Sequence, residues 1–209
     1  MRIADLILAA PALFVLSQVG CSSSGNGSAG SSDATCSAST PIMPTCKPLD
    51  YTTLDATPVS FKDDVFSAII RPTCNSTACH GVPLAQSTGV YPGAGLYLGP
   101  TASDNSTTVD ATLLNTIWGE LHLSSKTAPS LKIVAPMDPA NSFLMLKLTG
   151  CQNTKSLTCM VQSVSASETK TGCGDSMPPS CFAQSSNVAL TDAQIATFAR
   201  WIAQGAQNN

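Results

Sequence analysis

The chain has 209 residues, of which 11% are charged, and its formal net charge is -3. This length suits one sizeable domain with some additional segments rather than two full domains. Because so few basic residues cannot form the positive stripe that neutralises a phosphate backbone, the composition argues against a nucleic-acid partner.

The N-terminal residues have the pattern of a bacterial secretory signal. Arg2 provides a positive charge, and the apolar run at 6–16 is too short to cross a bilayer. The V-G-C sequence that ends at Cys21 resembles the lipobox of bacterial lipoproteins, although Gln18 replaces the usual aliphatic residue. We therefore expect a lipoprotein signal peptide at 1–20 and a lipid on Cys21 that anchors the chain in the cell envelope, facing the periplasm or in the outer membrane. The alternative is an ordinary signal peptide with Cys21 left as a thiol.

A tether and a cysteine-containing segment are expected between the signal and the compact domain. Residues 22–33 are almost entirely Ser and Gly, with too little apolar surface to offset the entropy of ordering. A Cys- and Pro-containing stretch follows, in which Cys36 and Cys46 could close a small loop. Tether and stretch together occupy 21–58, and the domain is expected at 59–209.

The first strong helix of the domain is predicted at 60–70. Ser60 and Asp63, three residues later, form a capping box, and the apolar residues that follow lie on one face. Pro72 stops the helix. A cysteine motif begins directly after it.

The last strong helix is predicted at 192–204. Thr191 is its N-cap, and Gln194 completes a capping box. Weaker helical patterns occur at 111–123 and 141–148, and the loops between them are rich in Gly, Pro and Ser. Because alternating strand patterns are sparse, the sequence predicts a mainly α domain with long loops.

The stretch C-N-S-T-A-C-H at 74–80 carries the candidate chemistry. It is close to the haem-attachment signature C-x-x-C-H, but four residues separate Cys74 from Cys79. Attachment requires two thiols that add to the two vinyl groups of the porphyrin, and a following histidine, here His80, that reaches the iron. The alternatives are a local disulfide between Cys74 and Cys79 with His80 as a bystander, or another metal, although a zinc site lacks a second ligand pair.

The number of cysteines does not decide between these alternatives. Eight cysteines follow Cys21, and an even number in an exported protein favours disulfides. Six remain if haem takes two, which is still even. Short loops could be closed by Cys151 with Cys159 and by Cys173 with Cys181, but four cysteines allow three pairings, so the choice stays open.

Five segments between positions 60 and 206 share an order with a known family. They are FSAIIRPTCNSTACHG, GAGLYLG, VAPMDPANSFLMLKLTG, GDSMPPS and IATFARWIAQGA. In this order they resemble the single-haem cytochrome c domains of exported bacterial proteins, especially those of soil myxobacteria and planctomycetes. No single segment is specific, so the resemblance depends on their shared order.

The resemblance implies a mainly α, cytochrome c-like helical domain with long disulfide-containing loops. It implies haem c attached through Cys74 and Cys79, with His80 as the proximal iron ligand and Met177, in a Met-Pro turn, as the distal one. The expected function is transfer of single electrons between redox partner proteins in the cell envelope, without enzymatic activity. The sequence departs from the family pattern in the longer cysteine spacer and at Met137, where glycine is usual.

Plainer alternatives accompany these expectations. Met177 could pack into the core as a loop methionine. His122 follows Trp118 at helical spacing and is expected at the edge of a packed face rather than on iron. No protease, hydrolase or nucleotide-binding motif occurs, and a cytochrome peroxidase usually needs two haems. A function of another class is a haem-free, disulfide-stabilised cell-surface scaffold or adhesion lipoprotein, which the long cysteine spacer favours.

Overall fold

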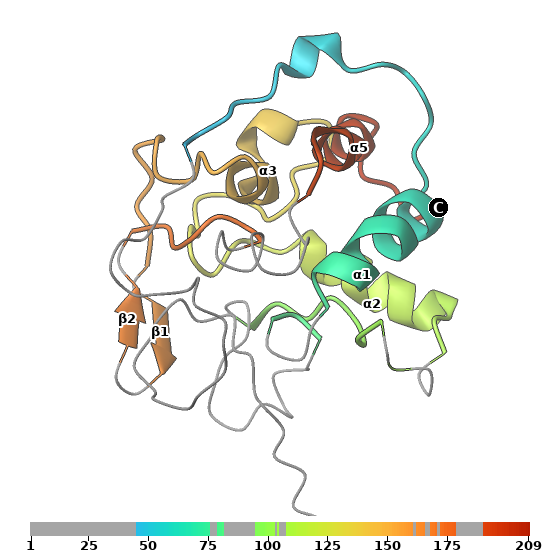
Figure 1. The fold of residues 1–209 in the computed structure, drawn as a ribbon, viewed down its shortest axis with the longest axis horizontal. Coiled ribbons are helices and arrows are strands. Elements are labelled where there is room, and N and C mark those ends of the chain that lie inside the picture. Colours follow the sequence, from blue (N-terminus) through green and yellow to red (C-terminus); the bar gives the residue numbers. More distant parts are fainter. Residues whose placement is uncertain are drawn as a thin grey trace, which may run out of the picture.

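A computed structural model of the chain describes residues 45–75, 79–81, 95–102, 104, 108–160, 162–165, 168–170, 172–178 and 190–209. The expected signal peptide, the Ser/Gly tether, the lipidation site Cys21, and Cys36 and Cys181 lie outside these residues. The described part is mainly helical, with one short pair of strands (Figure 1). Among the described residues, no helix combines the length and apolar character needed to cross a membrane.

The elements follow one another in this order. The helical ones are η1 (Tyr51–Thr53), η2 (Phe61–Ile70), α1 (Arg71–Thr73), α2 (Ala111–Leu121), η5 (Pro139–Asn141), α3 (Phe143–Leu148) and α5 (Asp192–Ala203). Strand β1 (Gln162–Ser165) pairs antiparallel with β2 (Glu168–Lys170) before α5. The four predicted helices are confirmed as η2, α2, α3 and α5, each within a few residues of its expected bounds. The prediction that Pro72 stops the first helix is wrong, because Pro72 lies near the start of α1, where a missing N–H is tolerated, and α1 continues the helix to Thr73.

The helix starts show why these segments are helical. The Thr191 hydroxyl accepts from the backbone N–H of Gln194, and the Gln194 side chain accepts from the Thr191 N–H, so the predicted capping box is confirmed. At η2, Ser60 accepts from the Asp63 N–H as predicted, at 3.2 Å. The second half of that box was predicted wrongly, because Asp64 and not Asp63 accepts from the Ser60 N–H, at 2.8 Å. The wider π-helical winding of η2 brings the later carboxylate back over the cap.

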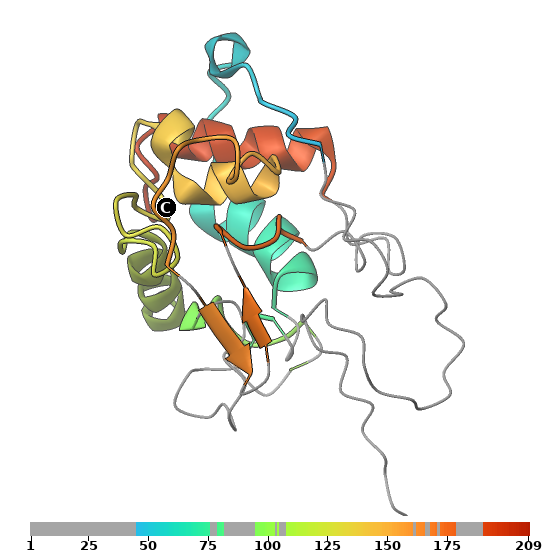
Figure 2. The ribbon, with the colours of Figure 1, turned by 90° about the vertical axis from the view of Figure 1, so that its left-hand side faces the viewer.

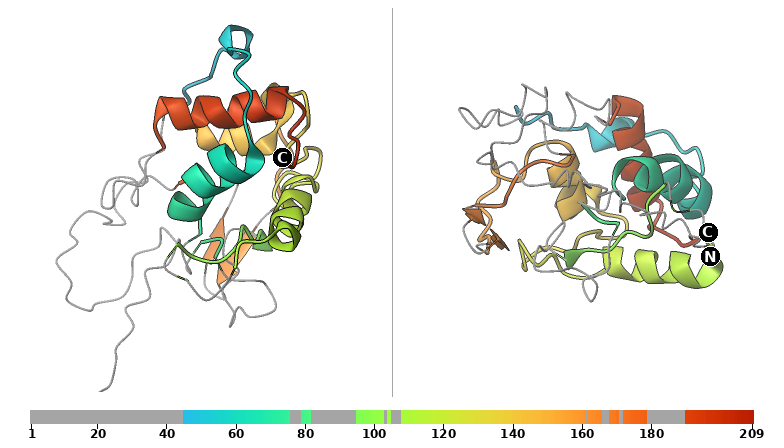
Figure 3. Two further views of the ribbon diagram at one scale, coloured as in Figure 1. Left: turned by 90° about the vertical axis from the view of Figure 1, so that its right-hand side faces the viewer. Right: turned by 60° about the horizontal axis from the view of Figure 1, so that its bottom comes forward.

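The core lies where η2 crosses α5. Figure 2 shows α3 and α5 side by side with η2 beneath them, and Figure 3 shows the same layers from the other side. The rings of Phe61 and Trp201 stack with their centroids 5.2 Å apart, and both side chains are fully buried. Phe66 from η2 and Ile117 from α2 are also fully buried, so α2 packs on the core beside η2 and α5.

The segment at 95–99 passes close to this core. Gly99 has a φ of +103°, and a Cβ added there would lie 2.8 Å from Cδ1 of Ile117. Both the backbone conformation and the space therefore require glycine at this position. Leu98, its neighbour, is buried against the same helices.

The end of the chain covers the start of η2. The backbone oxygen of Asn209 accepts from the N–H of Lys62 at 3.1 Å and from the hydroxyl of Ser60 at 2.9 Å. Its side-chain oxygen accepts from the Phe61 N–H at 2.9 Å. These bonds satisfy N–H groups that have no partner inside the helix.

Disulfides join parts of the chain that are distant in sequence. The structure pairs Cys46 with Cys151 and Cys159 with Cys173. The short loops considered from sequence, Cys36 with Cys46, Cys151 with Cys159 and Cys173 with Cys181, are therefore wrong. The reason is that the segment at 45–49 lies against the end of α3, where the Lys47 N–H donates to the Thr149 carbonyl at 3.0 Å.

Part of the segment expected before the domain packs on it. Leu49, Tyr51 and Leu54 contact the main core. Lys47 forms an ion pair with Asp192 at the start of α5, at 2.7 Å between Nζ and Oδ2. Residues from 45 onward are thus tied to the helices by a disulfide, an ion pair and apolar contacts.

Candidate functional site

The cysteine–histidine motif follows directly from the core helix. The N–H of Cys74 donates to the Ile70 carbonyl at 2.8 Å, so the first cysteine still belongs to the last helical turn. The N–H of His80 then donates to the Cys74 carbonyl at 3.2 Å and closes the motif into a loop. A rigid helix therefore presents this loop.

The loop is held against the segment at 96–100. Asn75 is buried, and its side-chain NH₂ donates to the carbonyls of Leu98 at 2.7 Å and Pro100 at 3.2 Å. The Leu98 N–H in turn donates to the His80 carbonyl at 2.9 Å. The sequence reasoning did not single out Asn75, and only its place directly after a cysteine hints at this role.

His80 is oriented by a hydrogen bond to the backbone. Its Nδ1 lies 2.8 Å from the Leu96 carbonyl oxygen, which can only accept, so Nδ1 carries the proton. Burial lowers the pKa of His80; the hydrogen bond to Leu96 opposes this shift, and the nearby charge of Lys147 adds to it. The imidazole is therefore neutral near pH 7, and Nε2 is the ring nitrogen with a lone pair for a metal.

The two motif cysteines differ in state. Cys74 has a free thiol, and burial raises its pKa. Cys79 is in a disulfide, and its partner is not Cys74. The local Cys74–Cys79 disulfide that the sequence offered as an alternative is therefore not formed.

Met177 lies in a turn that is attached to α3. Its backbone N–H donates to the Lys147 carbonyl at 2.9 Å, and its side chain is partly buried. The Lys147 ammonium donates to the carbonyls of Cys173, at 3.0 Å, and Asp175. Burial lowers the pKa of Lys147 to about 8. Lys147 was not predicted as a site residue; its only sequence signal is its place in the K-L-T-G segment.

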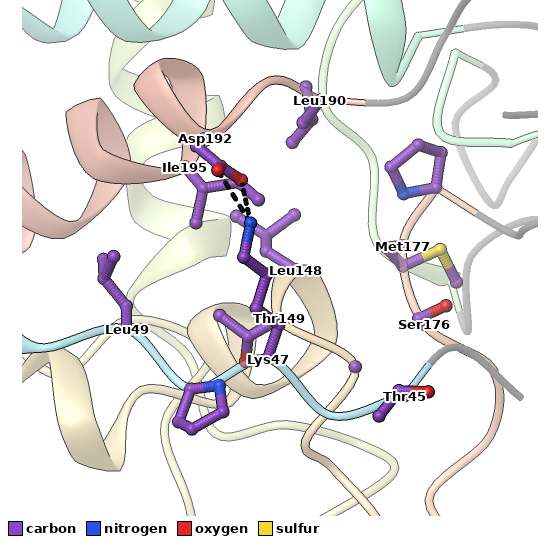
Figure 4. Close-up of a pocket in the computed structure, with 13 residues that line it drawn as sticks. Thr45, Lys47, Leu49, Leu148, Thr149, Ser176, Met177, Leu190, Asp192 and Ile195 are labelled. Atoms are coloured by element: carbon purple, nitrogen blue, oxygen red, sulfur yellow. Dashed lines mark hydrogen bonds and ion pairs between the residues drawn. The ribbon is translucent and has the colours of Figure 1, made fainter.

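An open pocket of about 380 Å³ lies beside Met177. Leu49, Leu148 and Ile195 form much of its apolar wall, and the ion pair between Lys47 and Asp192 crosses it (Figure 4). Both charged side chains are about three-quarters exposed, so this pair lies in water and contributes little to stability.

The second histidine is part of an aromatic cluster. The His122 ring lies 4.2 Å from the Trp118 ring and 6.3 Å from the Trp201 ring, centroid to centroid, and its Nδ1 lies 2.7 Å from the Trp118 carbonyl. This position at the edge of a packed face confirms the sequence prediction for His122. Within the part of the chain that the structure describes, no three His, Cys, Asp or Glu side chains gather as a metal site would require.

Met137 lies away from these groups. Its side chain is 74% exposed, and its N–H donates to the Ile202 carbonyl at 2.7 Å, near the C-terminal end of α5. Its φ is 66°, the left-handed region in which glycine is favoured. The position where the family pattern has glycine thus has a backbone suited to glycine.

No family profile, curated protein or solved structure matches this chain.

Three of the site residues carry groups of the kind that a c-type haem uses, and a fourth conflicts with it. His80 offers an oriented neutral imidazole, Cys74 offers a thiol, and Met177 offers a thioether on an attached turn. Cys79 does not fit while it is in a disulfide, because a thioether bond needs the same sulfur. Attachment through Cys74 alone is compatible with the disulfide, whereas attachment through both cysteines is not.

Proposed function

We propose that this protein is a c-type cytochrome that binds one covalent haem and passes single electrons between redox partner proteins in the cell envelope. The observation that supports it most strongly is the hydrogen bond between Nδ1 of His80 and the Leu96 carbonyl. Histidines that bind metals almost always donate their other ring N–H to a carbonyl or carboxylate, which fixes the ring and makes the ligating nitrogen more basic.

The residues that would hold the haem come from two places. Cys74 and His80 come from the loop after α1, and Met177 comes from the turn beside α3. A haem with one histidine and one methionine ligand exchanges one electron at a potential higher than a bis-histidine haem. The chain's own part is to orient the His80 imidazole, to hold Met177 in place and to exclude water with the core of η2 and α5.

A second candidate function is favoured by the disulfide at Cys79. A chain in which this sulfur is taken could be a haem-free scaffold or adhesion lipoprotein, with disulfides in place of the covalent cofactor. Two disulfides that such a scaffold would use are present in or against the smaller apolar cluster, and their four cysteines are Cys46, Cys151, Cys159 and Cys173. The two candidate functions differ at Cys74: its sulfur forms a thioether to haem in the cytochrome and carries no haem in the scaffold.

The test is to export the chain together with a cytochrome c maturation system, and then to apply a denaturing haem stain and intact mass analysis. A c-type cytochrome retains stain and gains the mass of haem. Cys74→Ser abolishes the attachment if Cys74 forms the single thioether, and leaves one thioether of two if Cys79 also forms one. A mass equal to the bare chain less two hydrogens per disulfide, with no stain, would reject the haem and leave the scaffold. Mapping the haem peptide shows whether Cys79 also forms a thioether.

Ligation is tested with the two histidines as a matched pair. His80→Gln should remove the low-spin spectrum of the ferrous protein, because iron loses its oriented imidazole. His122→Gln should leave that spectrum unchanged, because His122 packs between tryptophans. A low-spin spectrum that survives in His80→Gln but is lost in His122→Gln would show that the histidine ligand is His122 and not His80.

The location in the envelope is part of the same proposal. The V-G-C sequence before the tether supports lipidation of Cys21. Growth with a labelled fatty acid should label the chain and not the Cys21→Ser variant. Equal labelling of both chains would disprove the anchor without bearing on the haem.

A further inference from the structure

We propose that Lys147 is a positioning residue for Met177: it ties the turn at 173–177 to α3 through its side chain and its backbone together. This inference rests on the proposed haem function, in which Met177 and His80 bind the iron. Neither the cysteine motif nor the Met-Pro turn assigns a role to this lysine.

The contacts of Lys147 reach alternate residues of the turn. Its ammonium donates to the carbonyl of Cys173 at 3.0 Å and to that of Asp175, and its own carbonyl accepts from the Met177 N–H at 2.9 Å. Hydrogen bonds from a charged donor are stronger than those between neutral groups. One residue of α3 therefore fixes the backbone on both sides of the turn that leads into Met177.

The helix that carries Lys147 is itself fixed. Met145 and Leu146, its neighbours on α3, are buried at 0% and 5% exposure, in the two adjoining apolar clusters. The ammonium also lies 5.7 Å from the centre of the Phe143 ring. The turn is therefore anchored to the core rather than to a mobile surface.

The turn is shaped around the ammonium. Gly174 has a φ of +71°, and a Cβ added there would lie 3.3 Å from Nζ of Lys147. The Gly174 carbonyl accepts from the Gln152 side chain at 3.0 Å, and the Cys173 N–H donates to Asn153 at 3.1 Å. These contacts turn the carbonyls of residues 173 and 175 toward Lys147, so removing the ammonium leaves two backbone acceptors without their donor.

The attachment of the turn has a consequence for the proposed iron ligand. Without Lys147, the turn that leads into Met177 loses two of its three bonds to this residue. Loss of Lys147 should therefore lower the reduction potential through weaker methionine ligation.

The test compares Lys147→Gln with Lys155→Gln as a matched control. Lys155 also donates to a backbone carbonyl, that of Ala140 at 2.7 Å, but it is exposed, and its bonds go to Ala140 and Asn141 rather than to the turn. Amide hydrogen exchange at 172–178 is measured with and without haem, and the loaded proteins are examined for the sulfur-to-iron charge-transfer band and the reduction potential. We expect exchange at Met177 to become about tenfold faster in Lys147→Gln alone, with a weaker band and a lower potential.

The outcomes separate this inference from the function on which it rests. Unchanged exchange in Lys147→Gln overturns the attachment of the turn, whether or not haem binds. Faster exchange with an unchanged band and potential makes Lys147 structural only and overturns its role toward the iron. If the wild-type chain takes up no haem, the proposed function fails and with it the role toward iron, while the exchange data still decide the attachment of the turn.

Discussion

Replacement of Met137 by glycine should stabilise the protein, although it removes a whole side chain. Met137 has a φ of 66°, which brings Cβ close to the following carbonyl and costs about 1–2 kcal/mol for an L residue. Its side chain is 74% exposed, so little apolar burial is lost on removal. The backbone hydrogen bond from its N–H to the Ile202 carbonyl is kept by glycine.

The expected size follows from two opposing effects. Relief of the left-handed conformation is offset by the greater freedom of glycine in the unfolded chain, which costs about 0.5–1 kcal/mol. The free energy of unfolding should therefore rise by about 0.5–1 kcal/mol. For a chain of this length, such a gain raises Tm by about 1–4 °C.

The assay is urea unfolding followed by tryptophan fluorescence, with Met160→Gly as the matched control. Met160 is also exposed, at 57%, and its N–H also donates to a carbonyl, that of Thr127 at 2.8 Å. Met160 is not among the described residues with positive φ, so glycine there should only destabilise the protein. Equal losses of stability in the two variants would refute the argument from the backbone at Met137.

Two further predictions concern the attachments of the chain. Replacing both Cys46 and Cys151 by alanine removes a disulfide between residues 105 positions apart. The free energy of unfolding, measured with urea, should fall by about 4 kcal/mol, because the disulfide restricts the unfolded chain. A loss below about 1 kcal/mol would contradict this reasoning. For Lys147, the folded-state pKa of about 8 lies below the usual value of 10.5, so the unfolded chain binds more protons between these values and stability rises with pH. Between pH 7 and pH 9, the free energy of unfolding of the wild type should rise by about 1 kcal/mol relative to that of Lys147→Gln. If the wild type gains no stability relative to the variant over this range, burial does not disfavour the ammonium.

The state of Cys79 is the point at which the sequence and the structure differ most for function. From the motif alone, Cys74 and Cys79 are expected to share one role: both form thioethers to haem, or they form a disulfide with each other. In the structure Cys74 is a free thiol and Cys79 is in a disulfide elsewhere. A sulfur can form only one of these bonds, so the mapping of the haem peptide bears on both proposed functions at once.

Local patterns were sufficient to predict the helices. Thr191 and Gln194 form their box because both groups lie within four residues of each other, and the apolar spacing of η2 gives one buried face. His122 was placed correctly for the same reason, since its neighbours are set by helical periodicity. Such features depend on short stretches of chain that can be read directly.

The sequence by itself thus determined the helical elements and the place of the cysteine–histidine loop directly after the first core helix. Only the tertiary structure decided which cysteines pair, that Lys147 ties the Met177 turn to α3, and that the Leu96 carbonyl receives the His80 ring. These contacts join residues from 14 to 105 positions apart. They depend on how the helices pack against one another, and that packing is a property of the whole core rather than of any short segment.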